Sequence, residues 1–360
     1  MLPLLTVAAI LTSAPTALSP ILPGPLPDPH AVYIDGHWSI FGTGSQFFFY
    51  YGESLDPESM ERVSYEVDFS SFGRRPQIWG LVPHQEPDGS WHAFATLHIG
   101  GFRTVLAHLL PQGERAWTGE SPIDRWVFDR VIVGDIKKGD WSYYETKYIR
   151  DGDDAYLVYV AHERGRNKIF ARRMLDPATP DPAAEPVVLL EPQGLRSEDR
   201  NNPGGLQLVE GQSIKRINGL WTLLYSVGDF NYPANNYKLG IAYSNTLIPE
   251  DGQTYHKVTR VDSGNIWGNG RDTEEVVYLM QSQKQDWPND VSGFVRSPGL
   301  GSIISVGDTP MLLFHGYRAD QPNPGPDGRE VFLLPVEIDI PEGADAADNQ
   351  AEWVRIVLPQ

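Results

Sequence analysis

The sequence contains no cysteine, which excludes disulfide bonds, thiolate metal sites and a cysteine nucleophile. Basic residues are also scarce, because 29 Lys and Arg stand against 47 Asp and Glu, giving a formal net charge of −18. The basic residues form no stripe, so we expect neither nucleic acid nor an anionic membrane as a partner. No Asn-x-Ser/Thr glycosylation motif occurs in the chain.

The composition is that of a folded chain rich in strands. Hydrophobic residues make up 41% of the 360 positions, which is typical of a globular protein. The 35 Gly, 30 Pro and 11% aromatic residues favour many strands joined by tight turns. A chain of this length can fold as one all-β domain, which we expect over residues 20–360.

The N-terminus resembles a secretory signal. The run from Leu2 to Leu11 is almost wholly apolar, and small polar residues follow from Ser13 to Ser19. The run is too short to span a bilayer and lacks a preceding Lys or Arg. We expect residues 1–19 to be a signal peptide and the protein to be secreted. The alternative is a disordered or strand-like N-terminus of a cytosolic protein.

Five segments share the pattern of a β-hairpin, in which two alternating apolar runs flank a turn dipeptide. Asp-Gly and Asn-Gly are strong hairpin signals, because such turns need positive φ at both central residues. The blade-like spacing of the turns predicts a five-bladed β-propeller, whereas a β-sandwich would have shorter and more even spacing. The turn dipeptides are Asp35-Gly36, Asp88-Gly89, Asp151-Gly152, Asn218-Gly219 and Gly307-Asp308.

Several further segments carry expectations. The Pro-rich stretch 20–27 can be neither a helix nor a central strand. Residues 104–110 and 168–175 resemble third strands of blades two and three. We interpret 177–203 as an inter-blade loop, and 247–298 as a long connection with a short helix around residues 273–283.

Three of the hairpins begin with a carboxylate at a comparable place: Asp28, Glu145 and Glu210. If the first strand of each hairpin is the innermost of its blade, these side chains converge at one mouth of the central channel. Hydrolysis of a glycosidic bond needs one carboxylic acid and one ionised carboxylate. Crowding raises the pKa of one group and leaves the others ionised, so a third carboxylate can tune the acid.

Each carboxylate also has a plain structural interpretation. Asp28 could make an Asx-type turn, and Glu210 could cap a strand. Glu145 could be an exposed strand residue paired with Lys147 on the same face. The matched placement in three hairpins favours a shared site over these alternatives.

Predicted blades one, three, four and five, in the right order, resemble glycoside hydrolase family 43, the group of arabinanases, β-xylosidases and arabinofuranosidases. The first, PDPHAVYIDGHWSIFGTG, is similar to the opening blade of that family. The segment VEGQSIKRINGLWTLLYSVGDF, followed by YKLGIAYSNTL, is similar to the blade that carries Glu-Gly and the Gly-x-Ala-x-Ser strand. The segments GLGSIISVGDTPMLLFHGYR and GREVFLLPVEI resemble the last blade.

The resemblance implies a five-bladed propeller and an inverting mechanism. It implies that Asp28 is the general base, Glu210 the general acid and Glu145 the third carboxylate. It also places Arg329 in contact with the substrate from the last blade. His315, in FHG, matches a common family residue; it is a candidate substrate contact, and a structural hydrogen-bonding role is the favoured alternative.

Two departures from the family pattern matter. Glu145-Thr146 stands where the family usually has Asp-Pro, which leaves Asp140 as a competitor for the third carboxylate. Leu300 stands where the family often has a histidine near the propeller axis and a bound ion or water. We therefore expect no metal ion and no other cofactor.

Trp79, in QIWGL, is the candidate for an aromatic wall of the pocket.

The leading hypothesis is an inverting hydrolase of polysaccharides or oligosaccharides that contain arabinose or xylose, acting as a monomer. A retaining, fructosidase-like propeller ranks lower, because the chain lacks an Asn-Asp-Pro-Asn opening and an Arg-Asp-Pro motif. A third hypothesis is a catalytically silent carbohydrate-binding propeller, which the departures at Glu145 and Leu300 motivate.

Overall fold

In the structure, a computed structural model, the described regular elements are β-strands and short 3₁₀ turns. It describes residues 18–44, 47–113, 117–118, 121–136, 142–163, 165–195, 198, 206–230, 237–250, 252–260, 275–282, 290–321 and 325–358. The apolar run of the expected signal peptide and Asp140 lie outside these residues. Within the described part of the chain, no helix is long and apolar enough to cross a membrane.

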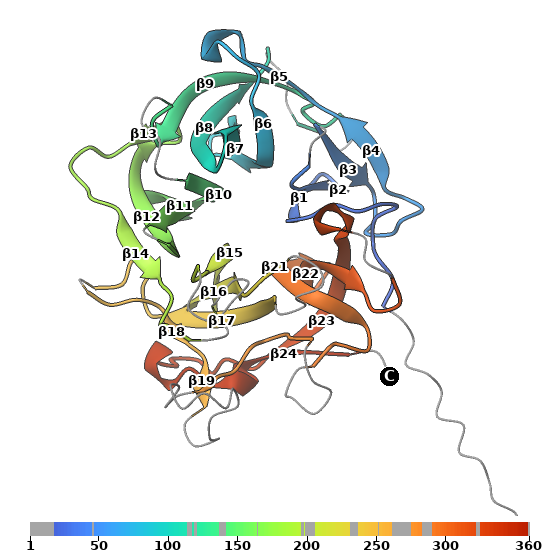
Figure 1. Cartoon of the computed structure of the whole chain (residues 1–360), viewed down its shortest axis with the longest axis vertical. Helices are drawn as coiled ribbons and strands as arrows, with labels where there is room; N and C mark the ends of the chain where they lie inside the picture. The colour runs from blue at the N-terminus through green and yellow to red at the C-terminus, as the bar shows by residue number, and fades with distance from the viewer. Residues whose placement is uncertain are drawn as a thin grey trace, which may run out of the picture.

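The described strands form five blades around a central axis, as Figure 1 shows. Blade one contains β1 (His30–Ile34), β2 (His37–Phe41), β3 (Phe48–Gly52) and β4 (Glu61–Ser64). Blade two contains β6 (Gln77–Gln85), β7 (Trp91–Gly100), β8 (Arg103–Pro111) and β9 (Arg125–Val133), and β5 (Glu66–Asp68) pairs in parallel with β9. Blade three contains β10 (Ser142–Asp151), β11 (Asp154–Glu163), β12 (Arg166–Asp176), β13 (Thr179–Pro180) and β14 (Val187–Leu190).

The last two blades complete the ring (Figure 1). Blade four contains β15 (Glu210–Ile217), β16 (Leu220–Val227), β17 (Lys238–Ser244) and β18 (His256–Lys257). Blade five contains β21 (Val295–Val306), β22 (Thr309–Arg318), β23 (Glu330–Ile338) and β24 (Val354–Ile356). Between these two blades in the sequence lies a small pair of strands, β19 (Thr259–Arg260) and β20 (Glu275–Val276). The described residues also form four short 3₁₀ turns, which are η1 (Ser70–Phe72), η3 (Pro326–Gly328), η4 (Ala346–Asp348) and η5 (Ala351–Trp353).

The predicted hairpins are present, but their turns differ in detail. Asp35-Gly36 and Asn218-Gly219 have positive φ at both central residues, as expected for these dipeptides. The turn predicted at Asp151-Gly152 lies one residue later, because Asp151 pairs with Asp154 and Gly152 takes the first central position. The Asp88-Gly89 turn belongs to a longer connection, because the last strand pair there is Gln85 with Trp91.

Two of the expectations for connecting segments are wrong. The segment 177–203 is not simply a loop, because the apolar run Val187–Leu190 pairs with β12 at the edge of blade three. The helix expected around residues 273–283 is absent from the described part of that segment. Glu275–Val276 forms β20, and Met280 makes a β-bridge with Leu239. Tertiary pairing offers these backbone groups partners, and therefore overrides their local preference.

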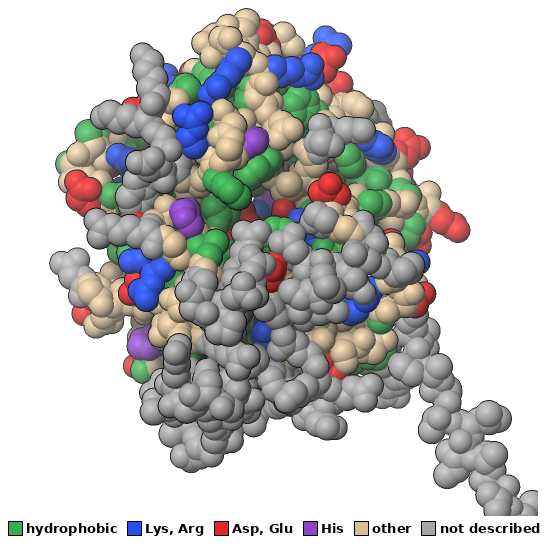
Figure 2. All heavy atoms as spheres, in the orientation of Figure 1, with side chains coloured by type: hydrophobic (Ala, Val, Ile, Leu, Met, Phe, Trp, Pro, Cys, Tyr) green, Lys and Arg blue, Asp and Glu red, His purple; other side chains and the backbone are tan. Residues whose placement is uncertain are grey.

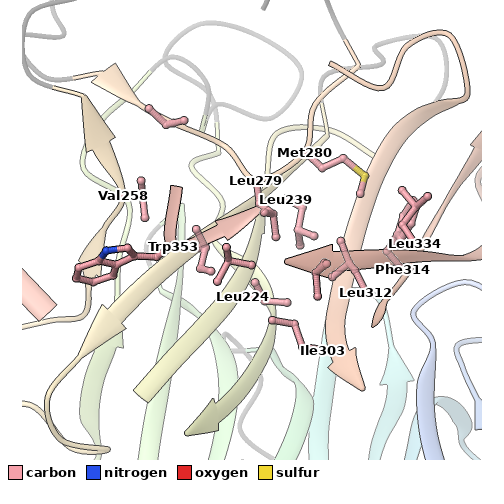
Figure 3. Packing of buried hydrophobic residues seen from close by; sticks show 14 of the residues in the cluster. Leu224, Leu239, Val258, Leu279, Met280, Ile303, Leu312, Phe314, Leu334 and Trp353 are labelled. Atoms are coloured by element: carbon pink, nitrogen blue, oxygen red, sulfur yellow. The ribbon is translucent and has the colours of Figure 1, made fainter. Parts of the chain in front are cut away.

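Alternate strand residues pack against opposite neighbouring blades. In β22, Leu312 and Phe314 join the core between blades four and five, whereas Leu313 joins the core between blades five and one. Figure 3 shows the first of these cores, with Leu224, Leu239, Ile303 and Leu334 among the side chains that fill it. The period of two in a strand thus gives each blade two apolar faces, which a ring of blades can bury.

The N-terminal lead-in closes the ring. The backbone N–H of Ile21 donates to the carbonyl of Val331 at 2.9 Å, and that of Leu26 donates to the carbonyl of Arg329 at 3.0 Å. The lead-in, which is neither helix nor strand as predicted, therefore lies along blade five. This contact places Asp28, just before β1, beside the last blade.

Candidate active site

A cavity of about 910 Å³ lies among the blades and receives all three of the predicted carboxylates. In the space-filling view, the centre of this face is hollowed, with hydrophobic and charged side chains around it (Figure 2). The residues that line the cavity include Asp28, Thr43, Trp79, Phe102, Tyr144, Glu145, His162, Asn167, Glu210, Phe230 and Arg329. The structure thus brings together residues that are far apart in the chain.

Unusual backbone geometry aims the carboxylates inward. Asp28 and Glu145 have φ values of 58° and 54°, in the left-handed region that non-glycine residues rarely adopt. Bulges interrupt the pairing of β10 between Tyr144 and Lys147, and of β15 just after Glu210. A bulge re-aims a side chain that would otherwise follow the alternation of the strand. Strain of this kind often accumulates at functional sites, where the surrounding structure maintains it.

Asp28 lies in a positively charged environment. Arg329 donates to its Oδ1 at 3.0 Å, and the backbone N–H of Asp28 donates to Nδ1 of His315 at 2.9 Å. Burial alone would raise the pKa of Asp28, but Arg329, His315 and the Thr43 hydroxyl outweigh it and hold the pKa well below its usual value. Asp28 is therefore ionised at any pH near neutrality.

Arg329 and His315 both lie beside Asp28, but only Arg329 lines the cavity. Arg329 lines the cavity and packs over the ring of Phe230, with 4.8 Å between its guanidinium carbon and the ring centroid. His315 is fully buried and does not line the cavity, so the expectation of a direct substrate contact does not fit its position. Burial and the nearby Arg329 lower the pKa of His315 to about 4, so a neutral imidazole supports Asp28. This position matches the structural role.

Glu210 lies in a different environment, formed by tyrosines. The hydroxyl of Tyr237 donates to its Oε1 at 2.8 Å, and that of Tyr144 donates to its Oε2 at 3.2 Å. Tyr237 is fully buried, and its ring lies where a side chain on Gly299 would collide, with only 2.0 Å from a Cβ there to the Tyr237 Cε1. The glycine in the Gly-Leu-Gly stretch of the last blade therefore makes room for this tyrosine.

A short hydrogen-bonded chain holds Tyr144. The side-chain amide of Asn167 donates to the Tyr144 hydroxyl, and the Oδ1 of Asn167 lies 2.7 Å from Nδ1 of His162. These residues come from β10, β11 and β12 of blade three. Neither Tyr144 nor Tyr237 was predicted from the sequence. Tyr144 could have been noticed as the immediate neighbour of Glu145, but nothing in the sequence around Tyr237 distinguishes it from a core tyrosine.

Glu145 lies between the other two carboxylates in its electrostatic contacts, because both Glu210 and Asp28 act on it. Its Oε2 accepts from the backbone N–H of Gly211, and its own N–H donates to the Thr96 hydroxyl at 3.1 Å. Burial, Glu210 and Asp28 raise its pKa well above the usual value, against the opposing effects of the Gly211 N–H and Lys147. Because Glu145 and Glu210 cannot both ionise easily, we describe them as a pair that holds one proton.

The aromatic wall lies on blade two. Trp79 lines the cavity and stacks on His98, with ring centroids 4.6 Å apart and planes 13° apart. His98 in turn contacts the Gly101 carbonyl at 2.7 Å, in the hairpin that carries Phe102. Phe102 also lines the cavity, although 86% of its surface is exposed. Trp79 was predicted from the sequence as an aromatic wall of the pocket. Phe102 was not predicted, because its exposure depends on the hairpin geometry.

A smaller cavity of about 50 Å³ lies on the axis, next to the main one, and is lined by Asp28, His30, Glu145, Lys147 and Leu300 among others. A leucine and a lysine ammonium group are poor surroundings for a metal cation. No cluster of three or more His, Asp or Glu suited to a metal occurs among the described residues. The prediction that no metal binds on the axis therefore suits these side chains and stays a prediction.

This arrangement gives the carboxylates the different proton affinities that acid–base catalysis needs. Asp28 is a carboxylate that stays ionised, whereas burial and the nearby Glu210 raise the pKa of Glu145. The environments of these groups drive their proton affinities apart, which is how enzymes assign acid and base roles.

No protein-family model and no curated protein matches the sequence. The fold, however, matches solved structures over nearly its whole length. A thermostable family-43 glycoside hydrolase is 16% identical, with a TM-score of 0.63, and the match covers 96% of this chain and 97% of that one.

Two further structures carry more specific descriptions. The α-L-arabinofuranosidase from Lactobacillus brevis is 16% identical, with a TM-score of 0.66 and coverage of 96% and 98%. The α-L-arabinanase from Cellvibrio cellulosa, complexed with arabinohexaose, is 15% identical, with a TM-score of 0.60 and coverage of 92% and 95%.

The chain has the fold of the family-43 glycoside hydrolases. The predicted five-bladed propeller is thereby confirmed, and the β-sandwich is excluded. Identities of this size establish the family-43 fold but not the activity, which has to be argued from the cavity itself.

Proposed function

We propose that this protein is an inverting glycoside hydrolase that acts on polysaccharides or oligosaccharides containing arabinose or xylose. The observation that carries the proposal is the convergence of Asp28, Glu145 and Glu210 on one cavity, with a depressed pKa for Asp28 and a raised pKa for Glu145. The family-43 fold and its arabinanase and arabinofuranosidase examples support the sugar class.

In the proposed mechanism, Asp28 is the general base. Its ionised carboxylate takes a proton from a water molecule, whose oxygen attacks the anomeric carbon. Arg329 and His315 keep Asp28 unprotonated and fixed in orientation. Glu210 is the general acid, which protonates the departing glycosidic oxygen as the bond to the anomeric carbon breaks. Glu145 is the third carboxylate. By repelling the ionised form of Glu210, it helps Glu210 to keep its proton until the proton is delivered to the glycosidic oxygen.

The stereochemical course is the finer part of the proposal. In a retaining mechanism, Asp28 would itself attack the sugar, and the carboxyl groups would lie about 5–5.5 Å apart, against about 6.5–9.5 Å for inversion. Proton NMR of the first-formed product distinguishes the two, because inversion gives the opposite anomer from that of the substrate. We also propose that the protein is secreted, on the basis of the apolar N-terminal run.

The direct test is to replace Asp28 by Asn and Glu210 by Gln. Because each removes a group that transfers a proton, each should reduce the hydrolysis of arabinosides or xylosides by about 10²–10⁴-fold. Chromogenic aryl arabinosides, xylosides and galactosides provide the activity screen. Asp153→Asn and Glu61→Gln, at exposed positions, make the same chemical changes away from the cavity and should leave activity unchanged.

Two outcomes would overturn the proposal. Full activity in both cavity variants, with native circular dichroism, would place the chemistry elsewhere. Binding of arabino- or xylo-oligosaccharides by the wild-type protein, without turnover of any substrate in the screen, would support the silent carbohydrate-binding propeller instead.

A further inference from the structure

A second layer of polar groups lies in the small axial cavity, next to the carboxylates. Lys147 on β10 and His30 on β1 approach each other across the axis, with 3.0 Å between Nζ of Lys147 and Nδ1 of His30. Each follows a site carboxylate closely in sequence, since Lys147 comes after Glu145 and His30 after Asp28. Both line the axial cavity together with these carboxylates, but neither lines the larger cavity.

Lys147 thus lines the axial cavity together with Glu145 and does not line the larger cavity. Burial lowers the pKa of Lys147 to about 8, while Glu145 and Asp28 act to raise it. The pKa of His30 is lowered well below its usual value by burial, Lys147 and His84, so His30 is neutral and its Nδ1 can accept a hydrogen bond from the ammonium group. Lys147 is therefore charged at neutral pH, and its charge faces Glu145.

The carboxylates on the two sides of the cavity differ in the groups that offset their negative charge. Asp28 has Arg329 in direct contact, whereas the Glu145 carboxylate accepts a backbone hydrogen bond from Gly211, and the charge of Lys147 favours its ionised form. We propose that Lys147 is a positioning residue of the active site: held by His30 in the axial cavity, its ammonium group sets the pH at which the Glu145–Glu210 pair gives up its shared proton. This inference rests on the proposed hydrolase function.

Other charged groups surround Lys147 and belong in the interpretation of any pH effect. His84 on β6 acts on His30, and it contacts Glu86 at 2.8 Å. Arg150, near the end of β10, pairs with Glu86. His84 lies on β6 and Glu86 just after it, and β6 packs against β10, where Arg150 lies three residues after Lys147. The groups that face Lys147 directly are His30, Asp28 and Glu145.

The experiment compares Lys147→Met with Lys147→Arg. Removing an opposite charge near a carboxyl raises its pKa by about one unit or more, so the alkaline limb of the kcat/KM profile of the Met variant should move to higher pH by that amount. The Arg variant, which keeps the charge, should lie closer to the wild type. Lys215→Met, an exposed charge loss at the far end of β15, is the matched control and should leave the profile in place.

A second measurement does not depend on activity. Carbon NMR of labelled glutamate side chains, with the Glu145 signal assigned by its loss in Glu145→Gln, reports the ionisation of this carboxyl directly. Its titration midpoint should rise in Lys147→Met and stay in place in Lys215→Met. Lys147→Gln replaces the Met variant if thermal unfolding shows that the latter does not fold.

The outcomes separate this inference from the proposed function. An unchanged Glu145 midpoint in a folded Lys147→Met or Lys147→Gln variant overturns the role of Lys147, whatever the activity. If no glycoside is hydrolysed by the wild type but the Glu145 midpoint still shifts, the electrostatic link stands and the proposed function fails.

Discussion

The two halves of the cavity use the same kind of side chain in opposite ways. On the blade one and five side, Asp28 contacts a guanidinium group and a buried imidazole. On the blade three and four side, Glu145 and Glu210 contact backbone N–H and tyrosine hydroxyl groups, and repel each other. The comparison shows that neighbours, and not the carboxyl group itself, decide which residue is ionised and which pair retains a proton.

The largest expected effect comes from removing the cation on the Asp28 side. In Arg329→Met, burial of Asp28 loses the largest effect that opposes it, so the pKa of Asp28 rises and the base is lost over part of the working pH range. We expect kcat/KM to fall about 100-fold or more at neutral pH, and the acid limb of its profile to move to higher pH. Arg355→Met, in an exposed ion pair on β24, is the control.

The same variant makes a prediction for stability. In the wild type the depressed pKa of Asp28 stabilises the fold above the unfolded pKa of about 3.9, and this contribution is lost as the pH falls through the folded pKa. Arg329→Met leaves a buried carboxylate unpaired, at a cost of about 3–5 kcal/mol at pH 7. The deficit in Tm should therefore shrink as the pH falls towards about 4, where the carboxyl takes up a proton. A deficit independent of pH would contradict this account.

A smaller effect is expected on the opposite side of the cavity. Tyr237→Phe removes the 2.8 Å hydrogen bond to Glu210 while keeping the ring, and a bond to a charged group is worth about 1.5–3 kcal/mol. We expect kcat to fall about 10- to 100-fold, with Tyr144→Phe losing less because its contact is longer. Tyr33→Phe, exposed on β1, should change nothing. Equal losses in Tyr237→Phe and Tyr33→Phe would remove Tyr237 from the site.

The smallest effect tests the neutral support of Asp28. Thr43 interacts with Asp28 through its hydroxyl, next to a far stronger partner in Arg329. Because the Thr43 hydroxyl also donates to the Trp79 carbonyl, Thr43→Val should lower kcat/KM by only about two- to tenfold, and Thr43→Ser should restore it. If Thr43→Val lost as much activity as Arg329→Met, the positive charge of Arg329 would not be what keeps Asp28 ionised.

The sequence carried enough information for the hairpins and for the three carboxylates. Asp35-Gly36 and Asn218-Gly219 specify their turns locally, because only a few dipeptides tolerate positive φ twice in succession. Asp28, Glu145 and Glu210 could be selected because they recur at comparable places in three repeats. The strand Val187–Leu190 and the pair β19–β20 could not, because runs of two to four residues are too short to show the period of a strand.

What the sequence determined by itself was the period of the pattern: alternating apolar residues, turns at blade-like intervals and an acidic residue ahead of three of the inner strands. Only the tertiary structure decided the environment of each acid. Arg329 reaches Asp28, and Tyr237 reaches Glu210, only after the ring has closed. Proton affinities depend on distances of a few ångströms between residues that are far apart in the chain, and the fold alone sets those distances.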